Sequence, residues 1–175
     1  MEEKLKKLIL ILKKGDQSAF EEFYQLTKEK IFYNIFALTK NYSLSEDLLQ
    51  DTYITFLKMI PNIDEEKSII GLLMTISRNL TLDFFRKNKK IVELDDIHEK
   101  TIKAEEKNNI DKHFLIDNIR KILNDKEMEI LILHIFSDMT FESIAKMKKK
   151  SLGTILWSYN NSIKKLKRSL NYENY

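Results

Sequence analysis

Residues 71–90, GLLMTISRNLTLDFFRKNKK, are the stretch from which the fold is most directly predicted. The large apolar residues recur at steps of three and four, which is the spacing of the buried face of an α-helix. They are Leu73, Ile76, Leu80 and Phe84. A second face repeats at the same steps and consists of Asn79, Asp83, Arg86 and Lys90. The stretch predicts an amphipathic helix with a basic end, either an ordinary surface helix or one whose polar face binds nucleic acid.

The composition favours an all-α fold. The 175 residues include only 3 glycines and 1 proline, too few for the many turns of a β-rich domain. With 43% hydrophobic residues and a net charge of +3, the chain has enough apolar side chains to fold. Its length fits one ordinary domain or two small ones.

The composition also argues against an enzyme. Cysteine is absent, which fits a reducing compartment and excludes a thiolate metal site. His98, His113 and His134 have no second ligand at the spacing that a metal-binding helix needs, and three glycines cannot form a phosphate-binding loop. We expect no catalytic residue, no metal and no cofactor. Because residues 8–12 are too short an apolar run to span a bilayer, we also expect a cytoplasmic protein without membrane insertion.

The first half of the chain predicts four helices. The first ends at Gly15, and Asp16 is expected to cap the second. Ser43 and Glu46 have the spacing of a capping box that opens the third helix. A polar loop over residues 61–68 then leads into the helix quoted above. The third helix has an acidic, polar face, which is either solvated or suited to a basic partner: Glu46, Asp47, Gln50, Asp51 and Thr55.

Residues 91–112 differ in composition from the helices on either side. They are rich in acids, contain few large apolar residues and have no clear period. We interpret them as a flexible acidic linker between two small helical domains, residues 1–90 and 113–175. A hidden amphipathic helix is the alternative.

The second half predicts a helix-turn-helix. Asn124 or Asp125 is expected to cap a helix that ends near residue 136, Thr140 a short one, and Ser151 a last helix that reaches about Leu170. The first of these would turn Met128, Leu131, Ile132 and Ile135 inward. No acid occurs between residues 143 and 172, while eight cations do. This imbalance favours contacts with phosphate groups over plain solvation.

Two separated parts of the chain resemble bacterial RNA polymerase sigma factors. GDQSAFEEFYQLTKEKIF (15–32), SEDLLQDTYITFLK (45–58) and LLMTISRNLTLDFFRKNKK (72–90) look like their sigma-two domain. LNDKEMEILILHIFSDMTFESIAKMKKKSLGTILWSYNNSIKKLK (123–167) resembles their sigma-four domain. Nothing corresponds to a sigma-three domain, so the domain content is similar to that of the extracytoplasmic-function (ECF) group.

The resemblance implies an alternative sigma factor, which would direct promoter recognition, DNA melting and transcription initiation while the polymerase performs the chemistry. The implied partners are RNA polymerase core, through the clamp helices of its largest subunit and its flap, promoter DNA, and an anti-sigma factor. In the family the connector between the two domains threads through the polymerase. The acidic linker would therefore occupy that channel or act as a passive tether.

The resemblance also implies a role for individual residues. The core-binding helix would contribute Asp47, Leu48, Gln50, Asp51, Thr55 and Lys58. The helix that reads the minus-ten element would contribute Asn79, Asp83, Arg86, Lys87 and Lys90. The loop over residues 61–69 would help to hold a flipped base, with Phe84 in the core and Phe85 as a contact. The minus-thirty-five helix would contribute Ser151, Thr154, Ser158, Asn160, Asn161, Lys164 and Lys165.

The last helix departs from the family pattern. Lys149 stands in the turn where many relatives have glycine, and Leu156, Ser158 and Asn161 stand where they have basic residues. Trp157 replaces a small polar residue. These changes leave the minus-thirty-five preference open. We expect Leu156 and Trp157 to pack in the core, the alternative being a partner such as an anti-sigma protein.

Two other functions fit parts of the sequence. A helix-turn-helix regulator that binds duplex DNA without polymerase would use the last helix but would leave the polar faces of the third and fourth helices unexplained. A sigma-like protein-interaction module would have no use for the phosphate-binding lysines.

Overall fold

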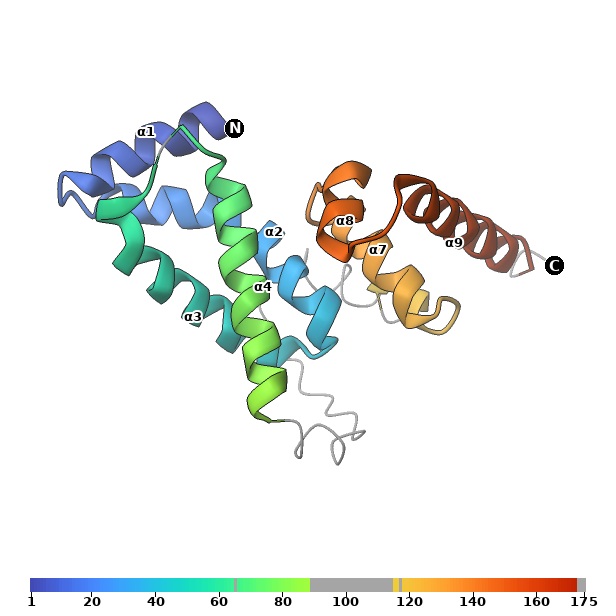
Figure 1. Ribbon diagram of the computed structural model, residues 1–175. Coiled ribbons are helices and arrows are strands. Elements are labelled where there is room, and N and C mark those ends of the chain that lie inside the picture. The colour runs from blue at the N-terminus through green and yellow to red at the C-terminus, as the bar shows by residue number, and fades with distance from the viewer. Residues whose placement is uncertain (65, 89–114, 117, 173–175) are drawn as a thin grey trace. The chain divides into compact units, whose positions relative to one another are not determined.

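The computed structural model describes residues 1–64, 66–88, 115–116 and 118–172 (Figure 1). These residues form α-helices and one short 3-10 helix and include no strand, so the predicted all-α class is confirmed. The chain divides into two compact units, Met1–Lys89 and Lys90–Tyr175. The predicted linker over residues 91–112 lies outside the described residues.

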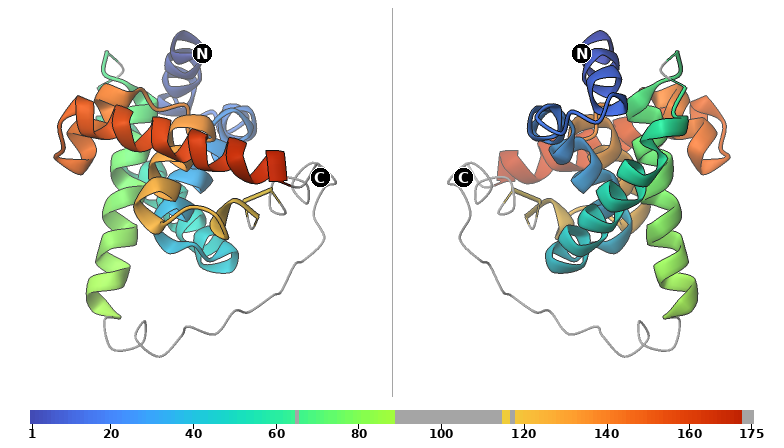
Figure 2. Two further views of the ribbon diagram at one scale, coloured as in Figure 1. Left: turned by 90° about the vertical axis from the view of Figure 1, so that its right-hand side faces the viewer. Right: turned by 90° about the vertical axis from the view of Figure 1, so that its left-hand side faces the viewer.

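The first unit is a four-helix arrangement around one apolar core. Its helices are α1 (Glu2–Lys13), α2 (Ala19–Thr39), α3 (Tyr42–Met59) and α4 (Ile69–Lys87), and the 3-10 helix η1 (Ile60–Asn62) directly follows α3. Figure 2 shows α3 running alongside α4. Fully buried side chains from all four helices meet in this core, among them Leu5, Ile9, Phe23, Phe56 and Leu73.

Two predicted helix caps of this unit are wrong. Ser18, not Asp16, precedes α2, and the Asp16 carboxylate accepts the backbone amide of Ser18 at 2.9 Å. Hydrogen bonds from Ser18 lower the pKa of Asp16 and hold this turn after Gly15, which delays the start of the helix. Asn41, not Ser43, caps α3, because its side chain accepts the Leu44 amide at 2.9 Å. Ser43 therefore lies inside the helix, and the predicted capping box does not form.

Buried polar contacts attach α2 to its neighbours, and periodicity does not predict them. The hydroxyls of Thr27 on α2 and Tyr53 on α3 lie 2.6 Å apart in the core. Asn34 on α2 donates from Nδ2 to the Met74 carbonyl at 3.1 Å and to the Ser77 hydroxyl at 2.8 Å, both on α4. These contacts fix which faces of the helices meet, since a buried polar group without a partner is costly.

Helix α1 holds both ends of the connection between α3 and α4, which passes beside it in Figure 1. At one end, Lys13 Nζ donates to the Ile63 carbonyl at 2.6 Å. At the other end, the Glu2 carboxylate accepts the Ser68 hydroxyl at 2.6 Å. Ser68 is also the N-cap of α4 and accepts the Gly71 amide at 3.0 Å. The connection is therefore tied at both ends to the same helix.

The second unit is built from α7 (Asp125–Ile135), α8 (Phe141–Lys148) and α9 (Leu152–Tyr172), preceded by helical residues at 115–116 and 118–120. The predicted starts of these three helices are confirmed. The side chains of Asn124 and Thr140 accept backbone amides of the first turns of α7 and α8, and Ser151 Oγ accepts the Thr154 amide at 3.2 Å. Ile135, predicted to point inward, is 47% exposed, because α7 ends at this residue.

Candidate functional site

The outer face of α3 combines carboxylates with apolar surface. Of the residues predicted to bind polymerase core, most are accessible: Asp47, Gln50, Asp51 and Lys58 are exposed and Thr55 is partly exposed. Leu48 is different, because it is 4% exposed and belongs to the core. The prediction that its side chain contacts a partner is therefore wrong for the folded unit.

Sequence reasoning missed Ile54 on this face. Its side chain is 50% exposed and lies three residues after Asp51 and four before Lys58, on the side of α3 opposite to the core. The available signal was its position, which does not match the period of the buried residues Leu49, Tyr53 and Phe56. An exposed isoleucine between charged residues is suited to a protein partner.

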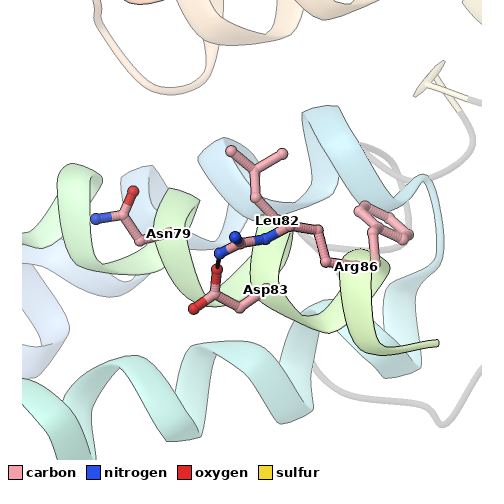
Figure 3. A pocket seen from close by; sticks show the side chains of 5 residues that line it. Asn79, Leu82, Asp83 and Arg86 are labelled. Atoms are coloured by element: carbon pink, nitrogen blue, oxygen red, sulfur yellow. Dashed lines mark hydrogen bonds and ion pairs between the residues drawn. The ribbon is translucent and has the colours of Figure 1, made fainter. Parts of the chain in front are cut away.

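The second half of α4 presents the predicted polar face, shown in Figure 3. Asn79, Arg86 and Lys87 are exposed, and Arg86 donates to the carboxylate of Asp83 one turn earlier. Lys90 lies outside the described residues. An open depression runs along this face and is lined by Asn79, Leu82, Asp83, Phe85 and Arg86. The face therefore offers amide, cationic and apolar groups together.

The two phenylalanines of α4 occupy the positions expected of them. Phe84 is partly buried and packs against the core of the first unit. Phe85 lines the depression, and its ring is tilted by 72° from that of Phe84 at a centroid distance of 6.0 Å. Leu82, 39% exposed, also borders the depression and was not predicted there.

The residues predicted on the minus-thirty-five helix divide into two groups. Ser151, Thr154, Asn160 and Lys164 are exposed, and Ser158 is partly buried. Asn161 and Lys165 instead bond to Glu127 of α7, so the structure places these two side chains in contacts inside the unit. The exposed residues of the first group are therefore the ones accessible to a partner.

Glu127 is the buried carboxylate of the second unit, with 5% of the residue exposed. It accepts the Asn124 amide at 3.1 Å, the Asn161 side-chain amide at 2.8 Å and the Lys165 ammonium at 2.8 and 2.9 Å. Burial would raise the pKa of Glu127, but the hydrogen bonds from Lys165, the Asn124 amide and Asn161 outweigh it and hold the pKa below its usual value. The sequence signal for this residue was the capping-box spacing after Asn124.

Trp157 is 70% exposed, so the expectation that it packs in the core is wrong. The inner side of α9 is formed by Ile155 and Ser162, which are 1% and 0% exposed. At 100° per residue, position 157 lies on nearly the opposite side of the helix from them. Leu156 is partly buried, which is closer to the expectation.

Lys149 ends α8 in the left-handed conformation, with φ of 52°. The amides of Lys149 and Lys150 donate to the carbonyls of Lys146 and Ala145 at 3.2 and 3.0 Å, which closes the helix in a Schellman-type turn. This is a conformation in which glycine has no steric penalty.

His134 links the helices of the second unit. Its Nδ1 donates to the Met139 carbonyl at 2.8 Å, and its ring stacks on Phe141 at a centroid distance of 4.0 Å and meets the edge of Tyr159 at 5.1 Å. Within the described ranges, no group of three histidine, cysteine or acidic residues could hold a metal ion. None of the helices in the described part of the chain is long and apolar enough to cross a bilayer.

Comparison with known proteins shows what the first unit is similar to. Residues 14–91 match the family model of Sigma-70 region 2. The chain is 35% identical over 95 residues to the ECF RNA polymerase sigma factor SigW of Bacillus subtilis (strain 168), covering 54% of this chain and 51% of that protein. It is 33% identical over 76 residues to SigM of the same organism, with 43% and 46% covered. The chain thus matches about half the length of these two curated relatives.

Other relatives match along more of the chain. The RNA polymerase sigma factor YlaC of Bacillus subtilis is 22% identical over 162 residues, covering 88% of this chain and 93% of that protein. The structure of CnrH in complex with the cytosolic domain of CnrY superimposes with a TM-score of 0.62 at 15% identity, covering 97% and 98% of the two chains. The sigma factor RpoE in complex with the anti-sigma factor NepR, from Bartonella quintana, gives 0.65 at 21% identity, with 87% and 96% covered.

The two structural matches show a shared fold. Together with the family model and the curated relatives, they confirm the resemblance to ECF-type sigma factors that the sequence predicted.

Proposed function

We propose that this chain is an ECF-type sigma factor, which acts in the cytoplasm, binds RNA polymerase core, recognises a promoter and helps to open it. The observation that carries the proposal is the Sigma-70 region 2 match over residues 14–91, because it covers the helices that present the outer face of α3 and the polar face of α4. Residues 1–90 would form the sigma-two-like domain, 91–112 the linker and 113–175 the sigma-four-like domain.

The outer face of α3 would bind the polymerase core. Asp47 and Asp51 are exposed carboxylates one turn apart, so they would attract the basic surface of a partner and orient it. Ile54 would provide the apolar contact at the centre of this face, where exclusion of water contributes most to affinity. The clamp helices of the largest subunit are the partner that the family resemblance suggests.

The polar face of α4 would read the minus-ten element. Arg86 and Lys87 supply positive charge for the DNA backbone, while the Asn79 amide can both donate to and accept from a base edge. An apolar wall beside these groups, formed by Leu82 and Phe85, gives an unstacked base a surface to lie against. Binding an unpaired base in this way would stabilise the open duplex without nucleotide hydrolysis.

The outer side of α9 would contact the minus-thirty-five element in the major groove. Thr154 and Asn160 are exposed hydrogen-bonding groups, and Lys164 is an exposed cation further along the same helix. An anti-sigma protein is a further partner, supported by the two structural neighbours, both of which were solved in complexes and one of which names an anti-sigma factor.

The test is run-off transcription with purified core polymerase, with and without this chain, on promoter DNA from its own genome. We expect new initiation at a defined start site only when the chain is present. If core that is active with another sigma factor gives no such product, the proposal is wrong. A stand-alone regulator would then still bind duplex DNA without core, whereas an interaction module would bind neither DNA nor heparin.

A further inference from the structure

Trp157 is a large apolar side chain on the surface of the described part of the second unit. Its side chain is the most exposed of the large apolar residues in the described part of the chain, at 70%. It is also the only tryptophan in the sequence. Tryptophan offers a partner a large apolar contact area. It is therefore enriched among the residues that contribute most to binding energy.

Trp157 lies in the middle of an exposed row on α9, which we call the outer row: Gly153, Trp157, Asn160 and Lys164. The steps of four, three and four place these four residues along one side of the helix. All four are exposed, whereas Ile155 and Ser162 on the other side are buried. The outer row is therefore a surface in which an apolar ring is flanked by an amide and a cation.

The charge around the outer row favours DNA over an average protein surface. Between residues 143 and 172 the sequence contains no acid, and Lys150, Lys164 and Arg168 are exposed. A protein partner of Trp157 would not require the surrounding charges to be all positive. A polyanion is the partner for which the surrounding cations are complementary.

Gly153 gives an independent indication of close approach. Apart from the adjoining residues and nearby backbone of α9 itself, a Cβ atom added there would meet no atom of the described residues within 4 Å, so packing does not require a glycine. Its φ lies outside the left-handed region, so backbone geometry does not require one either. Glycine inside a helix is generally unfavourable relative to alanine. The missing side chain leaves room one turn before Trp157 for a second surface to approach the helix backbone.

We infer that Trp157 contacts bases of duplex DNA in the major groove and favours thymine at one position of the upstream promoter element. The C5-methyl of thymine is the apolar group that base pairs present in that groove, and it is the natural contact for an indole ring. Gly153 would let the groove approach the helix, and Lys164 would bind a phosphate. The inference rests on the proposed function and adds to it a residue that determines specificity.

The experiment is a uracil scan of the upstream element with complete holoenzyme. The promoter found by run-off transcription is prepared with each upstream thymine replaced in turn by deoxyuridine, which removes one methyl group. For the wild type we expect binding to weaken about fourfold at one position, the effect of one buried methyl. For Trp157→Ala we expect weaker binding to the normal promoter and the same affinity with or without that methyl.

Leu152→Ala is the matched control, because Leu152 is also an exposed apolar residue of α9, at 39%, but lies outside the outer row. Holoenzyme with Leu152→Ala should lose as much affinity as the wild type when the same thymine is replaced by deoxyuridine. Because Trp157 is exposed, Trp157→Ala should keep the circular-dichroism spectrum and melting temperature of the wild type, so loss of binding would not be loss of folding.

The outcomes separate this inference from the proposed function. Absence of run-off product with wild-type holoenzyme would overturn both. Normal transcription with identical scans for wild type and Trp157→Ala would overturn the inference alone. A third outcome is that the scans are identical and Trp157→Ala no longer binds an anti-sigma domain. This result would assign the indole ring to a protein partner and would also overturn the inference.

Discussion

The ammonium of Lys165 on α9 lies 2.8 and 2.9 Å from the two carboxylate oxygens of Glu127 on α7. The same carboxylate accepts the backbone amide of Asn124 and the side-chain amide of Asn161. One buried acid thus joins the start of α7 to the middle of α9. Asn161 and Lys165, which the sequence predicted to contact DNA, instead hold α9 against α7.

Replacement of Glu127 by alanine should destabilise the second unit by about 2 kcal/mol, since the substitution removes a capping interaction and leaves Lys165 and Asn161 without their acceptor. Urea unfolding followed by circular dichroism measures the effect. The unfolding transition of the second unit is identified with Ile144→Ala, which creates a cavity in the core of that unit and should shift the same transition. Glu142→Ala, at an exposed acid of α8, should change it by less than about 0.5 kcal/mol.

The contribution of Glu127 should depend on pH in the acidic range. Its pKa is lowered in the folded state, so its contribution is complete above the ordinary value of 4.5 and is lost as the pH falls through the lowered folded value. The difference in unfolding free energy between wild type and Glu127→Gln should therefore be constant near neutral pH and shrink below 4.5. A difference that grew on acidification would contradict the direction of the pKa shift.

Substitution of Lys149 by glycine should stabilise the second unit by about 1 kcal/mol. Lys149 adopts a φ of 52°, which strains any residue with a Cβ. Because its side chain is exposed, glycine would remove this strain with little loss of packing. Thermal unfolding of the two proteins gives the comparison. Lys150→Gly should bring no gain, because Lys150 is not among the described residues with positive φ.

Charge reversal on the outer face of α3 should abolish binding to polymerase core. Asp47→Lys with Asp51→Lys would repel the basic surface that we propose as partner, and both side chains are exposed, so the fold should be unchanged. Co-purification with core is the measurement, with circular dichroism as the check on folding. Glu21→Lys with Glu22→Lys reverses two exposed charges on α2 and should leave binding intact. Retention of core by the α3 variant would remove that face from the proposed function.

Alanine at both Asn79 and Arg86 should lower the yield of open complexes while sparing core binding. These side chains lie on the exposed polar face of α4, so the loss concerns DNA contacts and not packing (Figure 3). Permanganate footprinting of unpaired thymines reports the opening. The control carries alanine at Lys7 and Gln25, an exposed cation and an exposed amide elsewhere in the unit. Normal footprints from the α4 variant would exclude this face from promoter opening.

Much of the fold could be predicted because helix periods and caps are local. Leu73 and Ile76 are buried as their spacing indicated, and Thr140 and Ser151 cap their helices as predicted. The predicted caps of α2 and α3 were wrong because each helix start has two residues of a cap-forming type two positions apart. They are Asp16 and Ser18 at α2, and Asn41 and Ser43 at α3. At α3 the extended backbone of Asn41 decided between them.

The candidate site was less predictable, since it depends on which face each helix turns outward. Nothing local distinguishes Lys164, which is exposed, from Lys165, which bonds to Glu127 thirty-eight residues away. The exposure of Trp157 was missed for a related reason. A large apolar side chain is assigned to the core by composition, and only its angular position relative to Ile155 and Ser162 places it outside.

The contacts of α1 bear on how this protein should be handled in the laboratory. The family match begins at residue 14, so α1 lies before the matched domain, yet Lys13 and Glu2 hold the two ends of the loop that, by the family resemblance, would help to hold a flipped base. A shortened version trimmed to the matched domain would keep the residues assigned to core and DNA and lose the support of that loop. Affinity tags and fluorophores are therefore better attached after the last helix than before the first.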